Sequence, residues 1–315
     1  MNNQQQISKD NSDKANQGVV AIIVTYHPSA QNLERLCINL SKQVQHIVVV
    51  DNGSRDEDLD VLSALTVAVK LEKLHKNYGI AHAQNKGIEI AKAQYAADYV
   101  VLFDQDSSPA PEMVSKLIAA YERLNEQNQQ VAALGPYYAD DRQQQLSPFV
   151  KLGLFNLKRI NQQNHPSNEC EVEFLIASGS LIPMKVLDQI GLMQSELFID
   201  HVDTEWCFRA RAQGYRVYGV FDAQMKHVLG DQVVQFLRRR FSVRSPLRNY
   251  YLMRNSMWLY QQKSPSLHWK LVDAWRLLVK FVVYSLIVPP RLKHVKMMLK
   301  GIWHGLTKQM GQFKD

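Results

Sequence analysis

The sequence predicts an α/β fold in which a mostly parallel sheet carries helices on both of its faces. Apolar runs of strand length alternate with amphipathic stretches through the first half of the chain. These runs are continuous rather than alternately apolar and polar, which indicates strands that are buried on both faces. Several runs end in a polar cluster, as expected at the strand ends where α/β sheets bind ligands.

The individual elements follow from runs of β-branched residues for strands and from one-sided apolar patterns for helices. Strands are expected at residues 19–25, 47–50, 67–74, 99–103, 131–136 and 174–183. Helices are expected at residues 32–41, 57–65, 79–93, 112–124 and 203–212, with an extended segment at 215–221. Pro111 marks the start of the fourth helix. The Gln- and Asn-rich residues 140–168 are expected to form a long loop.

Composition narrows the class of protein. The chain has 315 residues with 46% hydrophobic and 21% charged residues, which excludes collagen-like, mucin-like and wholly disordered proteins. Cys37, Cys170 and Cys207 are far apart, so neither a disulfide scaffold nor a structural zinc site is expected, and a reducing compartment is indicated. Residues 1–17 are expected to be a disordered polar tail without a secretory signal.

Charge is strongly uneven along the chain. Residues 226–315 contain 17 Lys and Arg against three acidic residues, a net charge of +14, whereas residues 1–225 carry −7. Such asymmetry indicates a polyanionic partner. Basic and aromatic residues flank the apolar run at 281–288, which is too short to span a bilayer. Three interpretations remain: a helix in the membrane interface, a helical appendage packed on the preceding domain, or a nucleic-acid-binding region that lacks a known motif.

Polar residues at the predicted strand ends form the first candidate site. Thr25 and Tyr26, Asp51 and Asn52, and the Asp104–Asp106 segment should open on one rim of the sheet. Two carboxylates one residue apart suit Mg²⁺ or Mn²⁺ shared with substrate phosphates, although a polar turn is the simpler reading of the same residues. Asp51 suits hydrogen bonds to a base or ribose, or alternatively a turn.

Three further segments contain candidate residues. Asn77 and Gly79 precede a helix whose N-terminus favours an anion, or else they serve helix–sheet packing. Asp200, Asp203 and Glu205 lie close to Trp206, which suits a general base beside a sugar-stacking ring; the alternative is acids stabilising a helix N-terminus. A lone histidine such as His227 is usually structural.

The order of the motifs resembles a known family. The segments are IVTYHP, VVVDNGS, NYGIAHAQNKG, LFDQDSSP, FLIASGSLIP, FIDHVDTEWCFRARAQGYRV and KHVLGD. Together they resemble the family 2 inverting glycosyltransferases of the GT-A fold, over roughly residues 18–310. Within that family, DQDSSP, SGSLI, FIDHVDTEW and SPLRNYYLMRN are similar to the bacterial rhamnosyltransferase group.

The resemblance implies a role for each candidate residue. Nucleotide-sugar binding is implied for Thr25, Tyr26, Asp51, Asn77, Gly79 and Asp104; metal binding for Asp104, Asp106 and His227; and acceptor binding for Glu205 and Trp206. Asp203 matches the catalytic base. Because relatives often carry Glu-Asp where this chain has Val202-Asp203, Asp200 and Glu205 stay as rival bases.

The resemblance also implies an activity and a setting. The expected reaction moves L-rhamnose from dTDP-L-rhamnose to a glycan or lipid-linked acceptor, with inversion and with Mg²⁺ or Mn²⁺. We expect a GT-A catalytic domain at residues 18–230 and a basic helical region at 231–315. An anionic membrane is the expected partner rather than nucleic acid, which places the enzyme on the cytoplasmic face of the bacterial inner membrane. The alternative is a non-catalytic nucleotide- or nucleic-acid-binding protein with a basic tail.

Overall fold

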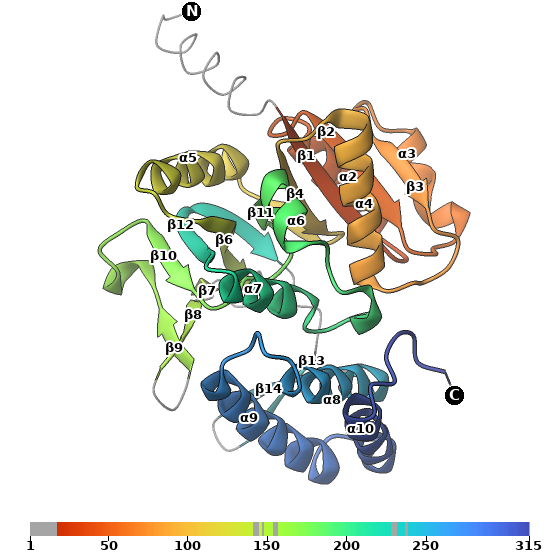
Figure 1. Cartoon of the computed structure of the whole chain (residues 1–315). Coiled ribbons are helices and arrows are strands. Elements are labelled where there is room, and N and C mark those ends of the chain that lie inside the picture. Colours follow the sequence, from red (N-terminus) through yellow and green to blue (C-terminus); the bar gives the residue numbers. More distant parts are fainter. Residues whose placement is uncertain are drawn as a thin grey trace, which may run out of the picture.

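The structure is a computed structural model that describes residues 18–140, 145–146, 148–153, 157–227, 232–236 and 239–314. The predicted polar tail at residues 1–17 lies outside this range. The predicted α/β class is confirmed: helices cover a central sheet, and a helical C-terminal region lies beside it (Figure 1).

The N-terminal half of the sheet is parallel, as predicted. The strand order here is β3-β2-β1-β4, and all three pairs are parallel. Residue bounds are β1 Val19–Thr25, β2 His46–Asp51, β3 Lys70–Lys73 and β4 Tyr99–Asp104. Thr25 pairs with Asp51, and Val24 pairs with Asp104, so these strands end together. The carboxyl ends therefore bring the predicted polar rim into one place.

The other half of the sheet is mixed. Strand β11 joins β4 to β6 by antiparallel pairing, and β12 runs parallel to β6. The bounds are β5 Ser107–Pro109, β6 Val131–Asp140, β7 Gln145–Leu146, β10 Glu169–Val172, β11 Leu181–Pro183 and β12 Arg216–His227. Strand β5 pairs antiparallel with the end of β12, which places the backbone of His227 opposite Ser107. The segment predicted as one strand at 174–183 is a strand only at its end.

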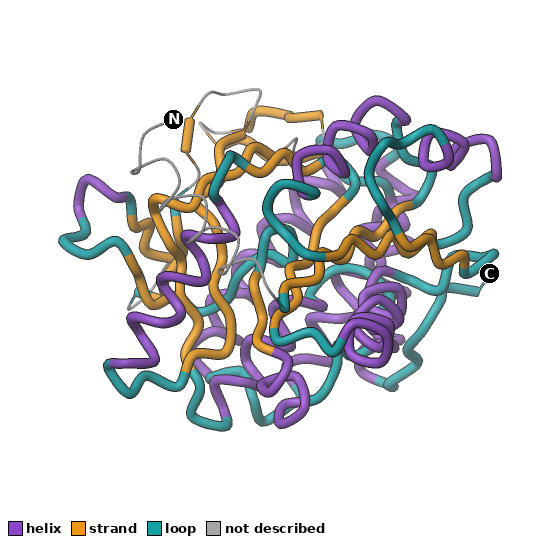
Figure 2. The backbone as a smooth tube through the Cα atoms, turned by 90° about the horizontal axis from the view of Figure 1, so that it is seen from above, coloured by secondary structure: helices purple, strands orange, loops and turns teal. Residues whose placement is uncertain are grey.

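Two helical layers bury the two faces of the sheet. Val20, Ile22 and Val24 of β1 pack with helices α4, α6 and α7, whereas the alternate residues of β1 pack with α2 and α5. The bounds are α2 Ala30–Leu40, α3 Asp60–Ser63, α4 Ile80–Tyr95, α5 Met113–Glu126, α6 Met184–Ile190 and α7 Val202–Ala212, with short 3-10 turns at Asp56–Leu59, Gln162–Asn164 and Ser195–Leu197. Viewed from above, the strands form a band with helices on either side (Figure 2).

The expectation of a long loop at residues 140–168 is wrong. Within it, β8 (Phe149–Leu152) and β9 (Leu157–Ile160) pair as an antiparallel hairpin. Phe149 is buried against the rings of Tyr137 and Phe221, with ring centroids 5.3 and 5.2 Å apart. This contact with the main sheet stabilises the hairpin, and a Gln- and Asn-rich sequence pattern does not reveal it.

The C-terminal region begins with a hairpin rather than the expected helix. Strands β13 (Gln232–Phe236) and β14 (Arg239–Val243) precede α8 (Pro246–Tyr260), α9 (Leu267–Leu286) and α10 (Arg291–Leu306). The three helices share an apolar cluster and form the blue lobe of Figure 1. Helix α10 packs so closely on α8 that only glycine fits at position 305. A Cβ atom there would come within 2.3 Å of the Arg254 carbonyl oxygen. No helix in the described part of the chain is long and apolar enough to cross a membrane.

Candidate active site

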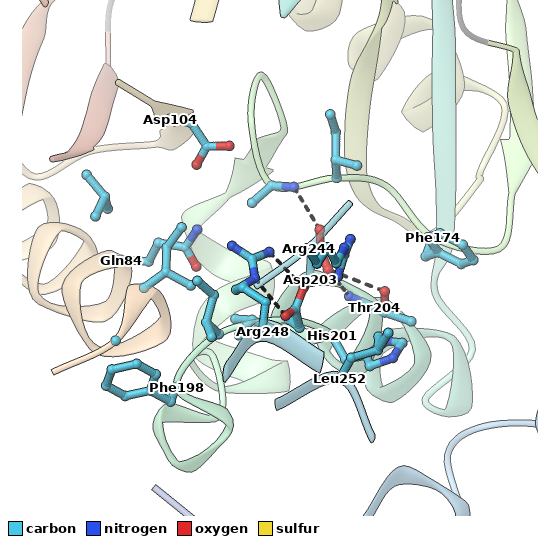
Figure 3. A pocket seen from close by; sticks show the side chains of 18 of the residues that line it. Gln84, Asp104, Phe174, Phe198, His201, Asp203, Thr204, Arg244, Arg248 and Leu252 are labelled. Atoms are coloured by element: carbon cyan, nitrogen blue, oxygen red, sulfur yellow. Dashed lines mark hydrogen bonds and ion pairs between the residues drawn. The ribbon is translucent and has the colours of Figure 1, made fainter. Parts of the chain in front are cut away.

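A pocket of about 730 Å³ opens where the parallel strands end, between the sheet and the C-terminal helices. Its walls come from three parts of the fold: the β1, β2 and β4 ends, the start of α7, and helices α8 and α9 (Figure 3). The predicted site residues among its lining are Thr25, Tyr26, Asn77, Gly79, Asp104, Asp106, Asp200 and Asp203.

Asp51, the last residue of β2, holds the neighbouring rim residues through hydrogen bonds. The Asp51 carboxylate accepts hydrogen bonds from the Thr25 hydroxyl at 3.0 Å and from the Gly53 and Ser54 backbone N–H groups at 3.1 and 2.9 Å. It is 1% exposed and does not line the pocket, whereas its neighbour Asn52 does. In this structure Asp51 therefore shapes the turn, whereas Asn52, which the sequence also placed on the rim, lines the pocket.

Two asparagines connect this turn to the start of helix α4. The Asn77 side-chain oxygen accepts hydrogen bonds from the Asn52 amide at 3.1 Å and from the Gly79 backbone N–H at 2.9 Å. Gly79 adopts a φ of 91°, and a Cβ atom there would lie 2.7 Å from the Phe198 Cα atom. The Ile80 N–H donates to the Phe198 carbonyl oxygen at 2.8 Å. The first turn of α4 thus holds the loop before α7, in addition to facing the pocket.

Asp104 and Asp106 lie across the pocket mouth from the C-terminal helices. Asp104 ends β4 and points toward the cavity in Figure 3. The turn is held by the Asp104 N–H, which donates to the Ser178 hydroxyl at 3.3 Å. Gln105 exchanges two hydrogen bonds with the Tyr26 backbone, at 2.7 and 3.2 Å, and fixes that residue at the rim.

The donor set available for a divalent cation is small. In the part of the chain that the structure describes, no three His, Cys, Asp or Glu side chains gather to hold a metal. The His227 side chain lies outside the described residues, but its backbone pairs with Ser107, one residue after Asp106. Two rim carboxylates facing an open pocket fit Mg²⁺ or Mn²⁺, which take few protein ligands and complete their shells with substrate phosphates.

Asp203 is in the first turn of α7, on the pocket wall. Its carboxylate accepts hydrogen bonds from the Thr204 N–H at 2.7 Å and from the Ala177 N–H at 3.2 Å. Burial raises the pKa of Asp203 above its ordinary value, and the hydrogen bonds from Thr204 and Ala177 only partly oppose this effect. A raised carboxyl pKa moves the proton affinity toward that of an effective general base.

Both rival carboxylates are committed to ion pairs. The Asp200 carboxylate binds the guanidinium groups of Arg244 at 2.9 Å and Arg248 at 2.9 Å. Burial alone would raise the pKa of Asp200, but the two arginines outweigh it and bring the pKa below its ordinary value. Glu205 is 5% exposed and pairs with Arg209 at 2.9 Å. Asp203 is therefore the carboxylate best suited to act as a base.

The structure does not bring the two predicted acceptor contacts to the large pocket. Glu205 points to Arg209, and Trp206 is 1% exposed with its indole N–H donating to the Gly191 carbonyl at 2.9 Å. Both side chains lie on the face of α7 that packs into the protein core. At 100° per residue, Glu205 lies about 200° around α7 from Asp203, and the Trp206 ring is buried in the core. Closeness to Asp203 in sequence therefore does not imply closeness to the substrate.

Comparison with known proteins shows the family of the chain. The profile of the family described as "Glycosyl transferase family 2" matches residues 21–191. The chain belongs to glycosyltransferase family 2. It is 33% identical over 272 residues to the dTDP-rhamnosyl transferase RfbF of Shigella flexneri, over 86% of this chain and 87% of that protein. The predicted resemblance to the bacterial rhamnosyltransferase group is confirmed, and the chain is an enzyme rather than a non-catalytic binding protein.

Two more distant relatives extend the comparison. The low-salt glycan biosynthesis hexosyltransferase Agl10 of Haloferax volcanii is 21% identical over 316 residues, covering 96% of this chain and 97% of that protein. A crystal structure of GalNAc-T7 with UDP, GalNAc and Mn²⁺ superposes with a TM-score of 0.55 and 14% identity, over 93% of this chain and 56% of that chain. The latter supports the GT-A type of fold for this family 2 transferase.

The transferase also contains site features that sequence reasoning missed. Arg254 and Asn255 of α8 are fully buried and donate hydrogen bonds to backbone carbonyl groups of residues 196–200. This loop contains left-handed φ angles at Phe198 (64°) and Asp200 (66°) and leads directly to α7. Such strain persists where the surroundings hold it, and it often marks functional segments. A polar Arg-Asn pair within an apolar helix was the available sequence signal.

Proposed function

We propose that the transferase moves L-rhamnose from dTDP-L-rhamnose to a hydroxyl group of a glycan or lipid-linked acceptor, with inversion at the anomeric carbon. The observation that carries this proposal is the placement of Asp203, a carboxylate with a raised pKa, in the same pocket as Asp104 and Asp106. The choice of donor is supported by the printed name of the Shigella flexneri relative.

The mechanism we infer is a single displacement. The acceptor hydroxyl oxygen forms a bond to the anomeric carbon while the bond from that carbon to the diphosphate oxygen breaks. Asp203 takes the hydroxyl proton, and the bonding electrons leave with the nucleoside diphosphate. Attack on the face opposite the leaving group inverts the configuration. A positioned carboxylate base of this kind contributes about 10²–10⁴-fold to the rate.

Asp104 and Asp106 are the residues that would hold Mg²⁺ or Mn²⁺, and the position of the His227 backbone beside β5 makes that histidine the third candidate. Such an ion supplies charge neutralisation to the departing diphosphate. Thr25, Tyr26, Asn52, Asn77 and Gly79 form the remaining wall at this end of the pocket, where we place the nucleotide. Asp51 acts by holding the Thr25 hydroxyl and the turn at Gly53.

We further propose that the C-terminal helices bind an anionic membrane surface. Helix α9 exposes an apolar stripe at three- and four-residue spacings: Leu267, Leu271, Trp275, Leu278, Val282 and Leu286. Helix α10 exposes a second group: Leu292, Leu299, Trp303 and Leu306. Lys293, Lys296 and Lys300 flank this second stripe on α10. Apolar stripes flanked by lysines match a lipid surface that combines an apolar interior with negative headgroups.

The inner face of the bacterial membrane is the setting we propose for this surface. The three cysteines of the transferase are free and buried, which agrees with a reducing compartment. In that position, the pocket beside α9 lies near the lipid surface, where a lipid-linked acceptor is held. The sequence alternatives of a membrane helix and a packed appendage are then compatible, because α8 packs on the catalytic domain while α9 and α10 expose the stripes.

One assay tests the proposed reaction. Purified protein is incubated with dTDP-L-rhamnose, Mg²⁺ or Mn²⁺ and bacterial membrane extract, and release of dTDP is measured. We expect release that requires both the metal and the extract, and that is reduced by about 10²-fold or more in Asp203→Asn. Equal turnover with and without EDTA would contradict the metal, and turnover of another nucleotide sugar alone would contradict the donor.

A further inference from the structure

The wall of the pocket that α8 and α9 supply carries an excess of positive charge. Arg244 from the segment before α8, Arg248 from the first turn of α8, and Arg276 and Lys280 from α9 all line the cavity. One carboxylate, Asp200, is shared by two of these cations, Arg244 and Arg248. The second acid on this wall, Asp273, accepts a hydrogen bond from the Tyr260 hydroxyl at 2.8 Å.

The nearby cations affect the protonation of Lys280. Its side chain is partly buried, and burial together with repulsion from Arg244 and Arg276 lowers its pKa to about 8. Among the described residues, no hydrogen-bond or ion-pair partner contacts Lys280 or Arg276. The negative charges of Asp273 and Asp200 act on Lys280 but do not offset burial and repulsion. A partly buried cation without a direct partner is costly, and an anionic ligand would relieve that cost.

Helix α9 has two opposite faces, one toward the pocket and one toward the protein surface. Trp269, Asp273, Arg276, Leu277 and Lys280 recur at helical spacing and line the pocket. The exposed apolar stripe that includes Leu271 and Trp275 lies on the opposite side of the helix, because 100° per residue separates the two sets by about half a turn. The cationic wall is therefore one helix diameter, about 10 Å, from the proposed lipid surface.

The displacement geometry assigns this wall to the acceptor. If Asp104 and Asp106 hold the donor diphosphate, the attacking hydroxyl approaches from the opposite side, where Asp203 receives its proton. In Figure 3, Asp104 lies apart from the group formed by Asp203, Arg244 and Arg248. Arg244 and Arg248 thus lie beside the base and away from Asp104, on the side from which we expect the acceptor to enter.

We propose that Arg276 and Lys280, with the guanidinium groups of Arg244 and Arg248, form a binding site for a phosphate or diphosphate group of the acceptor. The proposal rests on the proposed function, because it takes the donor to occupy the Asp104 end of the pocket. Positions 276 and 280 are one turn apart, so both side chains reach the same anion. Arginine and lysine are the residues that bind phosphate most effectively.

The experiment uses the full-length protein with its donor end filled. With dTDP and excess Mg²⁺ present at saturation, inorganic pyrophosphate is titrated into the protein by calorimetry at pH 8. We expect pyrophosphate to bind the wild type, and Lys280→Met and Arg276→Gln each to weaken binding about tenfold or more, since hydrogen bonds to charged groups contribute at that scale. Lys263→Met is the matched control, because Lys263 is an exposed lysine between α8 and α9 that does not line the pocket.

A second readout reports on Lys280 itself. Its lowered pKa means that a fraction of the ammonium groups is neutral at pH 8, so binding an anion takes up protons. Titrations in buffers of different ionisation enthalpy should show this uptake in the wild type and in Lys263→Met, and its loss in Lys280→Met.

The outcomes separate this site from the donor site. Equal pyrophosphate affinity in the wild type and both pocket variants would overturn the proposal. A parallel loss of dTDP affinity in those variants would also overturn it, because the cations would then serve the donor diphosphate. If dTDP fails to bind while pyrophosphate binding still requires Arg276 and Lys280, the phosphate site stands and the proposed donor is wrong.

Discussion

Replacing Asn255 with alanine should disable catalysis while leaving donor binding intact. The Asn255 amide is fully buried and donates to the carbonyl oxygens of Leu197 at 3.0 Å, Ile199 at 2.8 Å and Asp200 at 2.8 Å. These carbonyl groups belong to the loop that leads into α7 and positions Asp203. The loop contains strained residues, and such strain costs about 1–3 kcal/mol per residue when nothing else holds it.

The contacts set the size of the effect. The Leu197 carbonyl also accepts hydrogen bonds from the Arg254 guanidinium at 2.8 Å and from the Ile199 N–H at 2.7 Å, so it stays satisfied in the variant. The carbonyls of Ile199 and Asp200 lose this donor. At about 1–3 kcal/mol for each buried polar group left unsatisfied, the free energy of unfolding should fall by about 2–6 kcal/mol. A shift of Asp203 by about 1 Å should lower kcat by about 10²-fold.

The assay compares Asn255→Ala with a variant that is destabilised elsewhere. Asn249 is buried on the same helix and its amide lies 3.0 Å from the His294 ring, away from the loop. We expect Asn249→Ala to lower the unfolding midpoint in denaturant but to keep kcat, whereas Asn255→Ala lowers both. Affinity for dTDP should be unchanged in both variants. Wild-type kcat in folded Asn255→Ala, or an equal kcat loss in Asn249→Ala, would refute the reasoning.

Three further predictions follow from the site and the C-terminal helices. Burial raises the pKa of Asp203, and a base acts only when deprotonated, so kcat should fall on the acidic side through a pKa above the ordinary value of about 3.9; in Asp203→Asn the residual rate should lack this limb. Asp106→Ala should abolish metal-dependent turnover with an unchanged unfolding midpoint, since the residue lies at the open rim; a lowered midpoint would indicate a structural role. Anionic liposomes should carry the protein upward in a flotation assay at low salt, and less of it at high salt. The double variant Leu271→Ser with Trp275→Ser should float less at both salt concentrations, because both residues belong to the exposed apolar stripe of α9. Binding that depends on neither lipid charge nor salt would contradict the electrostatic part of the proposal.

Much of the sheet was predictable because its pattern is local. Continuous β-branched runs such as Val19–Thr25 are buried on both faces wherever they occur in a fold, so their sequence alone predicts a covered parallel strand. Asp104 at the end of β4 and Asp106 just after it share an edge of the sheet with Thr25, because neighbouring parallel strands end together. The position of Asp203 in the pocket followed from the resemblance, and the pocket geometry agrees with it.

Side-chain roles that depend on distant partners required the folded structure. Asp200 appeared as a rival base, but Arg244 and Arg248, more than 40 residues later, neutralise it. Glu205 and Trp206 appeared beside the acceptor, but the turn of α7 directs them into the core.

Sequence by itself determined which strands are buried on both faces, which polar residues lie on the rim, and the family. Local apolar patterns and ordered motifs are properties of the chain, so they do not depend on distant contacts. Only the tertiary structure decided that Asp200 and Glu205 are held in ion pairs and that part of the positive charge of the C-terminal region faces the pocket. Four of its cations line the pocket instead of lying only on the surface. The physical reason is that pKa and charge pairing depend on distances and burial, and these are set by helices α8 and α9 packing against a loop from the other end of the fold.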